Sequence, residues 1–571
     1  MNERLLEALD EAKRHRPGAN AAARVLRQAL RAQVGDADSL VRLHDAVLFL
    51  RAYPHSRRVL DLSEAILSAF AKRVASLASA GKDLSPFDHP EVSGIAGTSI
   101  TTDYSYDVVR WLKARFGRSV SIDWDLFEAT DRLRALWPAF LPLLEEEALE
   151  DANVPYVEYL RQGRGRSGDD LSWLLDRVGR FPLPPREKAE RFEAEDLSVE
   201  WLVGDTRFTR TRLRHGRGKL FFHDAPLVRH GVSIEVELAT PPLPWRRLSR
   251  REGAAVVEMT REATALRYRE YYGFTYADPG SVVRLEAGRG LEIYLMGLER
   301  ERRLPLRAGL AGFFVKNRVP VGYIEALAFF ERIEVGFNIY YCFREGESSW
   351  IFARVVKALN QVLGARSFSM DPYQIGHENE EAIKSGAFWF YRKVGFRSTD
   401  PALQALTLRE EEKIAADPSY RTPPGTLRRL ASENLLYEIA SSAPVQSQIT
   451  NRKSKNHWNH FHIRNLALAV NRRMARDFAG NSEAIRRSSE KSVSRKLGLS
   501  FARLDAAEKT AFSDLAMVLD LIPNLSRWSR EEKDAVSAII RAKAGRTERR
   551  YLHLLQRHAR LRAALIRLGS R

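Results

Sequence analysis

Apolar residues recur at helical spacing over most of the first 190 residues, as in SRRVLDLSEAILSAFAKRVASLA at 56–78. Apolar positions three and four residues apart predict helices with one buried face. A stretch rich in Gly, Pro and Ser at 78–99 interrupts the pattern, and helical spacing then resumes to about residue 180. We therefore expect a mainly helical N-terminal region at 1–190.

The spacing changes near residue 198. VEWLVGD, KLFFHDA and SIEVELAT alternate apolar and polar residues or carry β-branched side chains, which predicts strands. PPLPWRRL at 241–248 marks a boundary, and REGAAVVEMTREATALRYREYYGF at 251–274 predicts one helix with a glycine stop. NLLYEI, close to residue 440, predicts a last strand. We expect a mixed sheet region at 198–440.

Residues 290–400 carry the clearest pattern. Two apolar runs around Lys316-Asn317-Arg318 predict a hairpin, and IEVGFNIYYCF at 333–343 predicts a strand rich in aromatic residues. WIFARVVKALNQVLG then predicts a helix that ends at Gly364, ARSFSMD a strand, and NEEAIKSGAFWFYRKVG a helix that ends at Gly395. This order predicts an α/β (α+β) mixed sheet domain.

The charge of the chain is concentrated at one end. The net charge is +18, yet residues 451–571 hold 27 basic and 11 acidic residues, whereas residues 1–450 are nearly neutral. Such asymmetry is typical of proteins with an acidic partner, which can be nucleic acid, an anionic surface or an acidic protein. We expect a basic helical C-terminal region at 451–571.

Other compositional features narrow the class of protein. Cys342 is the single cysteine, which excludes a disulfide within the chain and a cysteine-based metal site. The N-terminal segment MNERLLEALDEAKRHR has no apolar core, and no run of about 18 apolar residues occurs. We expect no signal peptide, no membrane span, no metal and a cytoplasmic location.

The turn that follows the strand at 333–343 is a candidate anion site. It opens a helix directly, and the free N–H groups of a helix start carry partial positive charge that attracts phosphate. Gly346 would allow close approach, Arg344 could add charge, and Ser348 or Ser349 could cap the helix. On the local pattern alone, a capped helix after a turn explains these residues equally well.

The order of elements over roughly 290–400 resembles the GNAT acyltransferase superfamily. The loop of that family runs Gln/Arg-x-x-Gly-x-Gly/Ala, and this chain reads Phe343-Arg344-Glu345-Gly346-Glu347-Ser348. Later it reads Asn379-Glu-Glu-Ala382 and then Tyr391-Arg-Lys393-Val-Gly395-Phe396, with a longer interval between Asn and Tyr than the family has. The resemblance implies N-acyl transfer from acyl-coenzyme A to an amine. It implies a cofactor site at Arg344, Gly346, Ser348, Ser349 and Asn379.

The resemblance also implies a general acid. In GNAT enzymes this tyrosine lies near the thioester sulfur and protonates the leaving thiolate, which gives Tyr391 that role. The residues themselves allow another interpretation, because aromatic side chains at helical spacing before a Gly-Phe stop are typical of a core helix.

An amine must lose a proton before it attacks, so a base is expected nearby. Glu334, Gly336, Asn338 and Tyr340 share one face of the predicted strand, and polar residues on such a face suggest a pocket. Glu334 is the candidate base and Glu331 the second choice. If the strand begins at 335, Glu334 is simply solvated.

Two alternatives to this enzyme remain open. The chain could be a GNAT-like module that has lost the cofactor, because Glu345 and Glu347 would repel a phosphate, and a groove filled by Trp350, Phe388 or Trp389 would favour this. It would then bind nucleic acid or an acidic partner through 451–571, with Trp458, His460, Phe461 and Tyr551 interleaved among basic residues. The second alternative is an aminoacyl-tRNA-dependent transferase, which predicts a second GNAT-like half, although residues 198–300 supply strands without a clear copy.

Overall fold

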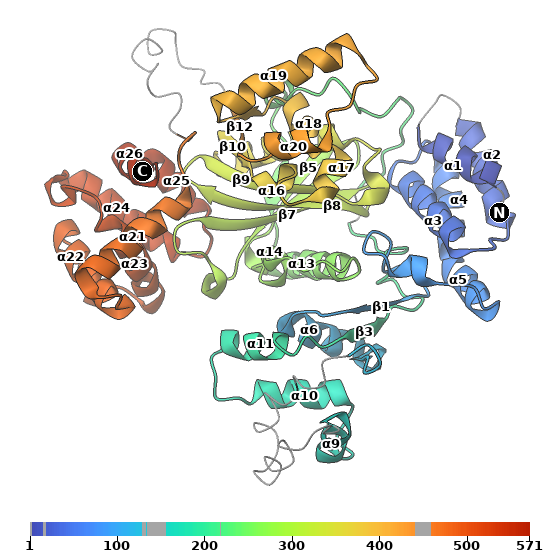
Figure 1. Cartoon of the computed structure of the whole chain (residues 1–571), viewed down its shortest axis with the longest axis horizontal. Coiled ribbons are helices and arrows are strands. Elements are labelled where there is room, and N and C mark those ends of the chain that lie inside the picture. The colour runs from blue at the N-terminus through green and yellow to red at the C-terminus, as the bar shows by residue number, and fades with distance from the viewer. Residues whose placement is uncertain are drawn as a thin grey trace.

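The computed structural model describes residues 3–14, 19–127, 133, 156–216, 218–439 and 458–570 (Figure 1). The chain is a mixed α/β protein. A nine-stranded sheet forms its centre, N-terminal helices lie at one end of the sheet and C-terminal helices at the other. The mixed sheet expected from the sequence is confirmed.

One pair of neighbouring strands in the large sheet is parallel. β9 and β10 run in the same direction, whereas the other pairs are antiparallel. In spatial order the strands are β11 (Arg397–Ser398), β12 (Leu435–Glu438), β10 (Ser367–Met370), β9 (Arg332–Ile339), β8 (Val319–Phe329), β7 (Ala308–Lys316), β6 (Leu291–Gly297), β5 (Val283–Gly288) and β4 (Trp245–Arg247). β4, β5 and β6 extend this same sheet, so residues 241–300 do not build the second GNAT-like half.

The predicted hairpin is β7 and β8. Its two turn residues, Asn317 and Arg318, have φ of 46° and 71°. Positive φ at both central positions matches the right-handed twist of the strands that the turn joins. Asn317 also fixes the hairpin to the N-terminal region, because its Nδ2 donates to the Ala52 carbonyl at 2.8 Å.

Helices cover both faces of the sheet. α13 (Arg250–Ala265) and α14 (Tyr272–Thr275) lie against one face, below the sheet in Figure 1. α15 (Ser348–Leu363) packs on the other face, where Phe352 meets Phe337 of β9 with ring centroids 5.0 Å apart. The connection from β10 to β12 carries α16 (Pro372–Ile375), α17 (Glu380–Ser385), α18 (Ala387–Lys393), α19 (Pro401–Ala416) and α20 (Pro424–Leu430).

The N-terminal region is mainly helical and includes a small three-stranded antiparallel sheet. The elements are α1 (Glu3–Lys13), α2 (Ala19–Arg31), α3 (Ala37–Ala52), α4 (Arg57–Ser68), α5 (Phe70–Ser79), β1 (Ser99–Thr102), α6 (Tyr106–Phe116), β2 (Val120–Ile122), α9 (Tyr156–Arg164), α10 (Asp170–Gly179), α11 (Pro185–Glu193) and β3 (Val199–Leu202). α4 buries one apolar stripe, as the spacing predicts, whereas every residue of α3 from Ala46 to Ala52 is buried.

The C-terminal region is helical, as expected, over its described residues. It joins the sheet through Glu331, which accepts from the Trp458 indole N–H at 2.8 Å and from Arg562 Nε at 3.0 Å. Its elements are α21 (Ile463–Phe478), α22 (Ser482–Leu497), α23 (Ala506–Leu519), α24 (Arg530–Lys543), α25 (Arg549–Arg557) and α26 (Ala559–Gly569). Residues 451–457 of the predicted basic region lie outside the described residues.

Four predicted elements are wrong. The helix expected at 251–274 ends at Ala265, and the one expected at 379–395 is two helices, because Gly386 adopts φ of 70° between α17 and α18. SIEVELAT forms the short helix α12 (Ile234–Ala239), and KLFFHDA is irregular. In the described residues, no helix is long and apolar enough to cross a bilayer.

Candidate functional site

The sheet opens where its parallel pair separates. β10 pairs with β9 only from Arg332 to Glu334, although β9 continues to Ile339. The turn that follows leads into α15, and α18 lies on the same side of the sheet. The residues implied by the GNAT resemblance surround this opening, so the structure brings most of them to one end of the sheet.

The predicted cofactor loop is covered by the N-terminal region. Gly346 is buried, and a Cβ built on it would lie 2.6 Å from the hydroxyl oxygen of Tyr53, the residue that ends α3. Tyr53 is itself fully buried. The close approach that Gly346 permits is therefore made by a side chain of the same protein.

A buried carboxylate lies beside this loop. Glu347 is fully buried and accepts from Lys316 Nζ at 2.7 Å and from the Val228 backbone N–H at 3.1 Å. Arg289 pairs with the same carboxylate at 2.6 Å. Both cations nearest the start of α15 are thus engaged by Glu347, and that carboxylate would repel a phosphate placed there.

The remaining loop residues hold the loop itself. Arg344 donates from Nη2 to Glu381 at 2.7 Å and stacks 3.7 Å above the Tyr341 ring. Ser348 Oγ donates to the Arg344 carbonyl at 3.1 Å, and Ser349 next to it is half-buried. The loop as folded does not fit the pyrophosphate of acyl-coenzyme A.

Asn379 lies outside the loop, at the start of a different helix. Its side-chain oxygen accepts from the Ala382 N–H at 3.1 Å, and its Nδ2 donates to the Tyr373 carbonyl at 3.0 Å. This is the geometry of an N-cap, and both polar atoms of the amide are used. Asn379 therefore starts α17 in this structure.

Tyr391 fills the opening between β9 and β10. It is 3% exposed, and its hydroxyl lies beside the backbone of Phe337 in β9. Phe352 and Phe396 pack against its ring, with centroids 5.5 and 5.8 Å away. Burial raises the pKa of Tyr391 well above its ordinary value. Trp350 and Phe388 are also buried, at 4% and 1% exposure, so the region expected to hold a thioester is filled by side chains.

The opposite face of the same strands is more open. Five residues of β8 and β9 point to this face and are half-buried: Glu325, Leu327, Glu334, Gly336 and Asn338. α14 borders the face on one side, because a Cβ on Gly273 would meet Ala311 of β7. α16 borders it on the other side, with Gln374 against Gly336.

Glu325 is the residue on this face that the sequence analysis missed. It lies opposite Gly336, which has no side chain to cover it, and burial raises the pKa of the Glu325 carboxyl. No ion pair to it is present among the described residues. The available signal was its position, since it is the lone charge in the apolar run GYIEALAFF. A base that removes a proton near neutral pH has such a raised pKa.

The two predicted bases differ in their surroundings. Glu334 lies on the open face with its side chain 35% exposed and pairs with Arg307 at 3.6 Å. Glu331 binds Arg562 and Trp458 between the sheet and the C-terminal helices, and although burial would raise its pKa, these donors lower it. The structure therefore places Glu334 on the same sheet face as Glu325. Glu331 instead holds the C-terminal helices against the sheet.

The C-terminal helices enclose a basic hollow of about 900 Å³. We call it the arginine hollow, and it is lined by residues from α22 through the start of α25. Five arginines face it with two acidic residues, Glu508 and Asp534; the arginines are Arg503, Arg530, Arg541, Arg546 and Arg550. Arg530 pairs with Asp534 at 3.0 Å, and Arg541 approaches Glu508 only to 3.9 Å. Positive charge remains in excess.

Three of the aromatic residues expected to stack on bases are buried. Trp458, Phe461 and Tyr551 are 3%, 5% and 0% exposed, whereas His460 is exposed. Base stacking needs an accessible ring face, so this part of the expectation is wrong. The rings pack between the C-terminal helices and the sheet, as in the 6.0 Å stack of Phe461 on Phe329.

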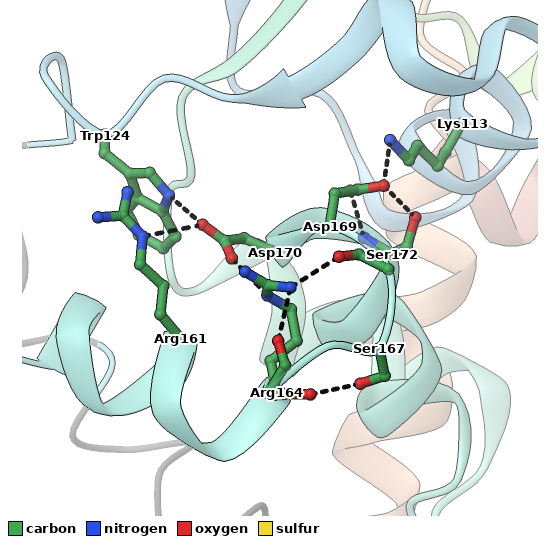
Figure 2. A network of polar contacts seen from close by, with 10 residues as sticks. Lys113, Trp124, Arg161, Arg164, Ser167, Asp169, Asp170 and Ser172 are labelled. Carbon is green, nitrogen blue, oxygen red and sulfur yellow. Dashed lines mark hydrogen bonds and ion pairs between the residues drawn. The ribbon is translucent and has the colours of Figure 1, made fainter.

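A polar network in the N-terminal region is structural. Figure 2 shows Asp170 of α10 between Trp124, Arg161 and Arg164, and the carboxylate accepts from their N–H groups at 2.9, 3.3 and 2.8 Å. Asp169 caps the same helix through the Ser172 N–H and pairs with Lys113 at 3.0 Å. Each carboxylate already has a cationic partner, so the network joins α9, α10 and α6.

Within the described ranges, no group of three or more His, Cys, Asp and Glu residues is arranged to hold a metal ion. No protein-family model matches the chain, and neither a curated protein nor a solved structure matches it significantly.

Proposed function

We propose that this chain binds the phosphate backbone of a nucleic acid through its arginine hollow, with the GNAT-like sheet region as a scaffold that has lost the coenzyme A site. The observation that carries the proposal is the hollow of about 900 Å³ with five arginines and two acidic residues. The cytoplasmic location expected from the sequence is part of this proposal.

The chemistry of the hollow suits phosphate groups. Arg503, Arg546 and Arg550 are exposed, and none has a carboxylate partner within 4.0 Å among the described residues. A guanidinium presents a fork of N–H donors that matches two phosphate oxygens. Exposed cations also release counterions when they neutralise phosphates, which drives association.

The burial of the aromatic rings favours contact with the backbone over contact with bases. A protein that reads single strands by stacking exposes rings, whereas contact with phosphates needs only cations. The excess of basic residues over 451–571 extends the positive surface beyond the hollow. A duplex is therefore the expected form of the nucleic acid.

Two features support the scaffold part of the proposal. The single parallel pair, with α15 in the connection between its two strands and β12 inserted between β10 and β11, fits the resemblance to the GNAT superfamily. The loop at Gly346 is covered by Tyr53, and Tyr391 fills the opening. A groove filled in this way favours a module over a coenzyme A enzyme.

The test is an affinity measurement with matched variants. Fluorescence anisotropy of a labelled RNA or DNA duplex should report binding by the wild type. The triple variant R541Q/R546Q/R550Q should bind at least about tenfold more weakly, whereas R476Q/R487Q/R560Q, which removes the same charge outside the hollow, should bind nearly as well. Equal losses in both triples would contradict a specific role of the hollow, and preference for an acidic protein would replace nucleic acid as the partner.

A second candidate function is acyl transfer to an amine, and the open sheet face favours it. Glu325 and Glu334 lie together there, and the raised pKa of Glu325 suits a base that deprotonates an ammonium group. In this candidate the amine binds above Gly336 with Glu325 as the base. The acyl donor then reaches that face by a route other than the covered loop.

Acetyl-coenzyme A separates the two candidates. A ligand at 100 times its dissociation constant stabilises a fold by about 2.7 kcal/mol, which thermal unfolding detects. The scaffold proposal predicts no such shift up to millimolar acetyl-coenzyme A. A shift that disappears in Gly346→Glu would restore the family cofactor site, and one that survives this change would direct the search to the open face. Loss of amine acylation in Glu325→Gln would then identify the base.

A further inference from the structure

Three arginines converge inside the protein around the end of β9. Arg51 comes from α3, Arg210 from the irregular segment that follows β3, and Arg267 from the turn after α13. All three are at least nine-tenths buried. Cys342, three residues beyond β9, lies within electrostatic reach of each of them.

The three guanidinium groups bind mostly backbone carbonyls. Arg51 donates to the carbonyls of Thr211 and Leu213 at 2.6 and 3.2 Å. Arg267 donates to the Ala263 carbonyl at 2.5 Å and stacks 3.9 Å above the Tyr340 ring. These contacts fix the positions of the side chains without neutralising their charge.

One carboxylate balances one of the three charges. Arg210 pairs with Asp45 at 3.3 Å. His44, beside Asp45, adds no positive charge at neutral pH, because burial lowers its pKa to about 4. The nearby carboxylates Glu64 and Glu381 are taken by other arginines, Arg214 and Arg344.

Two buried guanidinium groups are therefore left without a counter-charge. An uncompensated ion in the protein interior costs several kcal/mol, so such groups are normally paired or bind an ion. Arg51 and Arg267 have no carboxylate within 4.0 Å among the described residues. The arrangement favours an anion as part of the folded protein.

Unused donors point to where that anion would bind. The Nε atoms of Arg51, Arg210 and Arg267 and the hydroxyl of Tyr340 are buried and have no hydrogen-bond partner in the described structure. Buried polar groups without a partner are rare in folded proteins and call for an explanation. Cys342, which lies within electrostatic reach of the three arginines, is half-buried and so more exposed than they are.

We propose that Arg51, Arg210, Arg267 and Tyr340 form a binding site for a tetrahedral oxyanion, phosphate or sulfate, which enters beside Cys342. Guanidinium Nε–H groups and a tyrosine hydroxyl are donors, as an oxyanion requires. The site joins α3, the segment at 210–213, the turn after α13 and the end of β9. The anion thereby links the N-terminal region to the sheet, independently of the arginine hollow.

The single cysteine makes the site measurable. Cys342 is modified with a neutral maleimide in sodium phosphate, in sodium sulfate and in sodium chloride of equal ionic strength, and thermal unfolding is recorded in the same buffers. We expect inorganic phosphate to slow the modification and to raise the melting temperature in a saturable manner that chloride does not reproduce. Sulfate and a phosphate monoester, used as further probes, distinguish a general oxyanion site from one for a phosphorylated ligand.

Variants decide whether the response belongs to this site. Tyr340→Phe removes only the hydroxyl and should weaken phosphate binding severalfold, and Arg267→Gln should abolish it. Arg473→Gln removes a charge from α21, where Arg473 pairs with Asp520, and should leave phosphate binding unchanged. The inference is overturned if phosphate and chloride act alike on both the modification rate and the melting temperature, or if Tyr340→Phe and Arg267→Gln respond to phosphate like the wild type.

Discussion

At the scale of single residues, Tyr391 shows how one side chain can satisfy a family motif and still be structural. Its hydroxyl lies beside the Phe337 backbone of β9, and aromatic rings surround it. We predict that Tyr391→Phe lowers the free energy of unfolding by about 1–2 kcal/mol, because the buried polar contact between the hydroxyl and the Phe337 backbone is lost. Urea unfolding measures this loss. Unchanged stability together with lost acyl transfer would instead assign Tyr391 to catalysis.

His44 gives a prediction for pH. Its buried ring meets Thr211 Oγ1 at 3.1 Å, and burial lowers its pKa from 6.5 to about 4. The unfolded chain therefore binds a proton that the folded chain does not, and stability falls as pH falls from 6.5 toward 4. Between pH 7 and pH 5 this histidine should cost about 2 kcal/mol. His44→Gln should remove that part of the pH dependence, and identical pH profiles for the two proteins would refute the assignment.

At the scale of elements, the sequence predicted those with a strong local signal. The hairpin of β7 and β8, the strand β9 and the helix α15 follow from spacing, turn residues and the stop at Gly364. The split between α17 and α18 was missed because aromatic residues at helical spacing continue past Gly386. SIEVELAT alternates like a strand, yet Ser233 caps a helix there. The spacing of apolar residues alone does not distinguish one helix from two at Gly386, or a strand from a short helix at SIEVELAT.

The contact between α3 and the loop before α15 explains why the cofactor site could not be predicted. Tyr53 and Gly346 are far apart in sequence, and neither carries a signal that they touch. We predict that Gly346→Ala costs about 1–3 kcal/mol, because its Cβ would lie 2.6 Å from the Tyr53 hydroxyl oxygen. A double-mutant cycle with Tyr53→Ala should recover most of that loss. Additive losses would show that Tyr53 does not cover the loop.

The attachment of the C-terminal helices to the sheet depends on Glu331. Its carboxylate accepts from Trp458 and Arg562 in a partly buried setting. We predict that Glu331→Gln lowers the free energy of unfolding by about 2 kcal/mol, because it removes the charge that pairs with Arg562 and one of the two acceptor oxygens. Arg560→Gln, which breaks the exposed pair with Glu532, should change it by less than about 1 kcal/mol. Equal effects in the two variants would contradict a docking role for Glu331.

At the scale of the whole molecule, the sequence showed that basic residues are concentrated toward the C-terminal end. It did not show how the fold arranges them in space. The basic excess over 451–571 follows from counting residues. The gathering of five arginines around one hollow depends on how α22, α23 and α24 pack, and the burial of Trp458 and Tyr551 depends on docking to the sheet. Glu325 could not be identified from the sequence for the same reason. Its exposure depends on Gly336 of the neighbouring strand and on the positions of α14 and α16.

The most direct test of the central claim is the salt dependence of duplex binding. For each phosphate that a protein neutralises, the logarithm of the affinity falls with the logarithm of salt concentration by a slope of about 0.9. We predict a steep slope for the wild type and a slope smaller by about 2–3 for R541Q/R546Q/R550Q, while R476Q/R487Q/R560Q keeps the wild-type slope. A wild type without measurable duplex binding at low salt, or equal slopes in all three proteins, would contradict the claim that the arginine hollow binds nucleic acid.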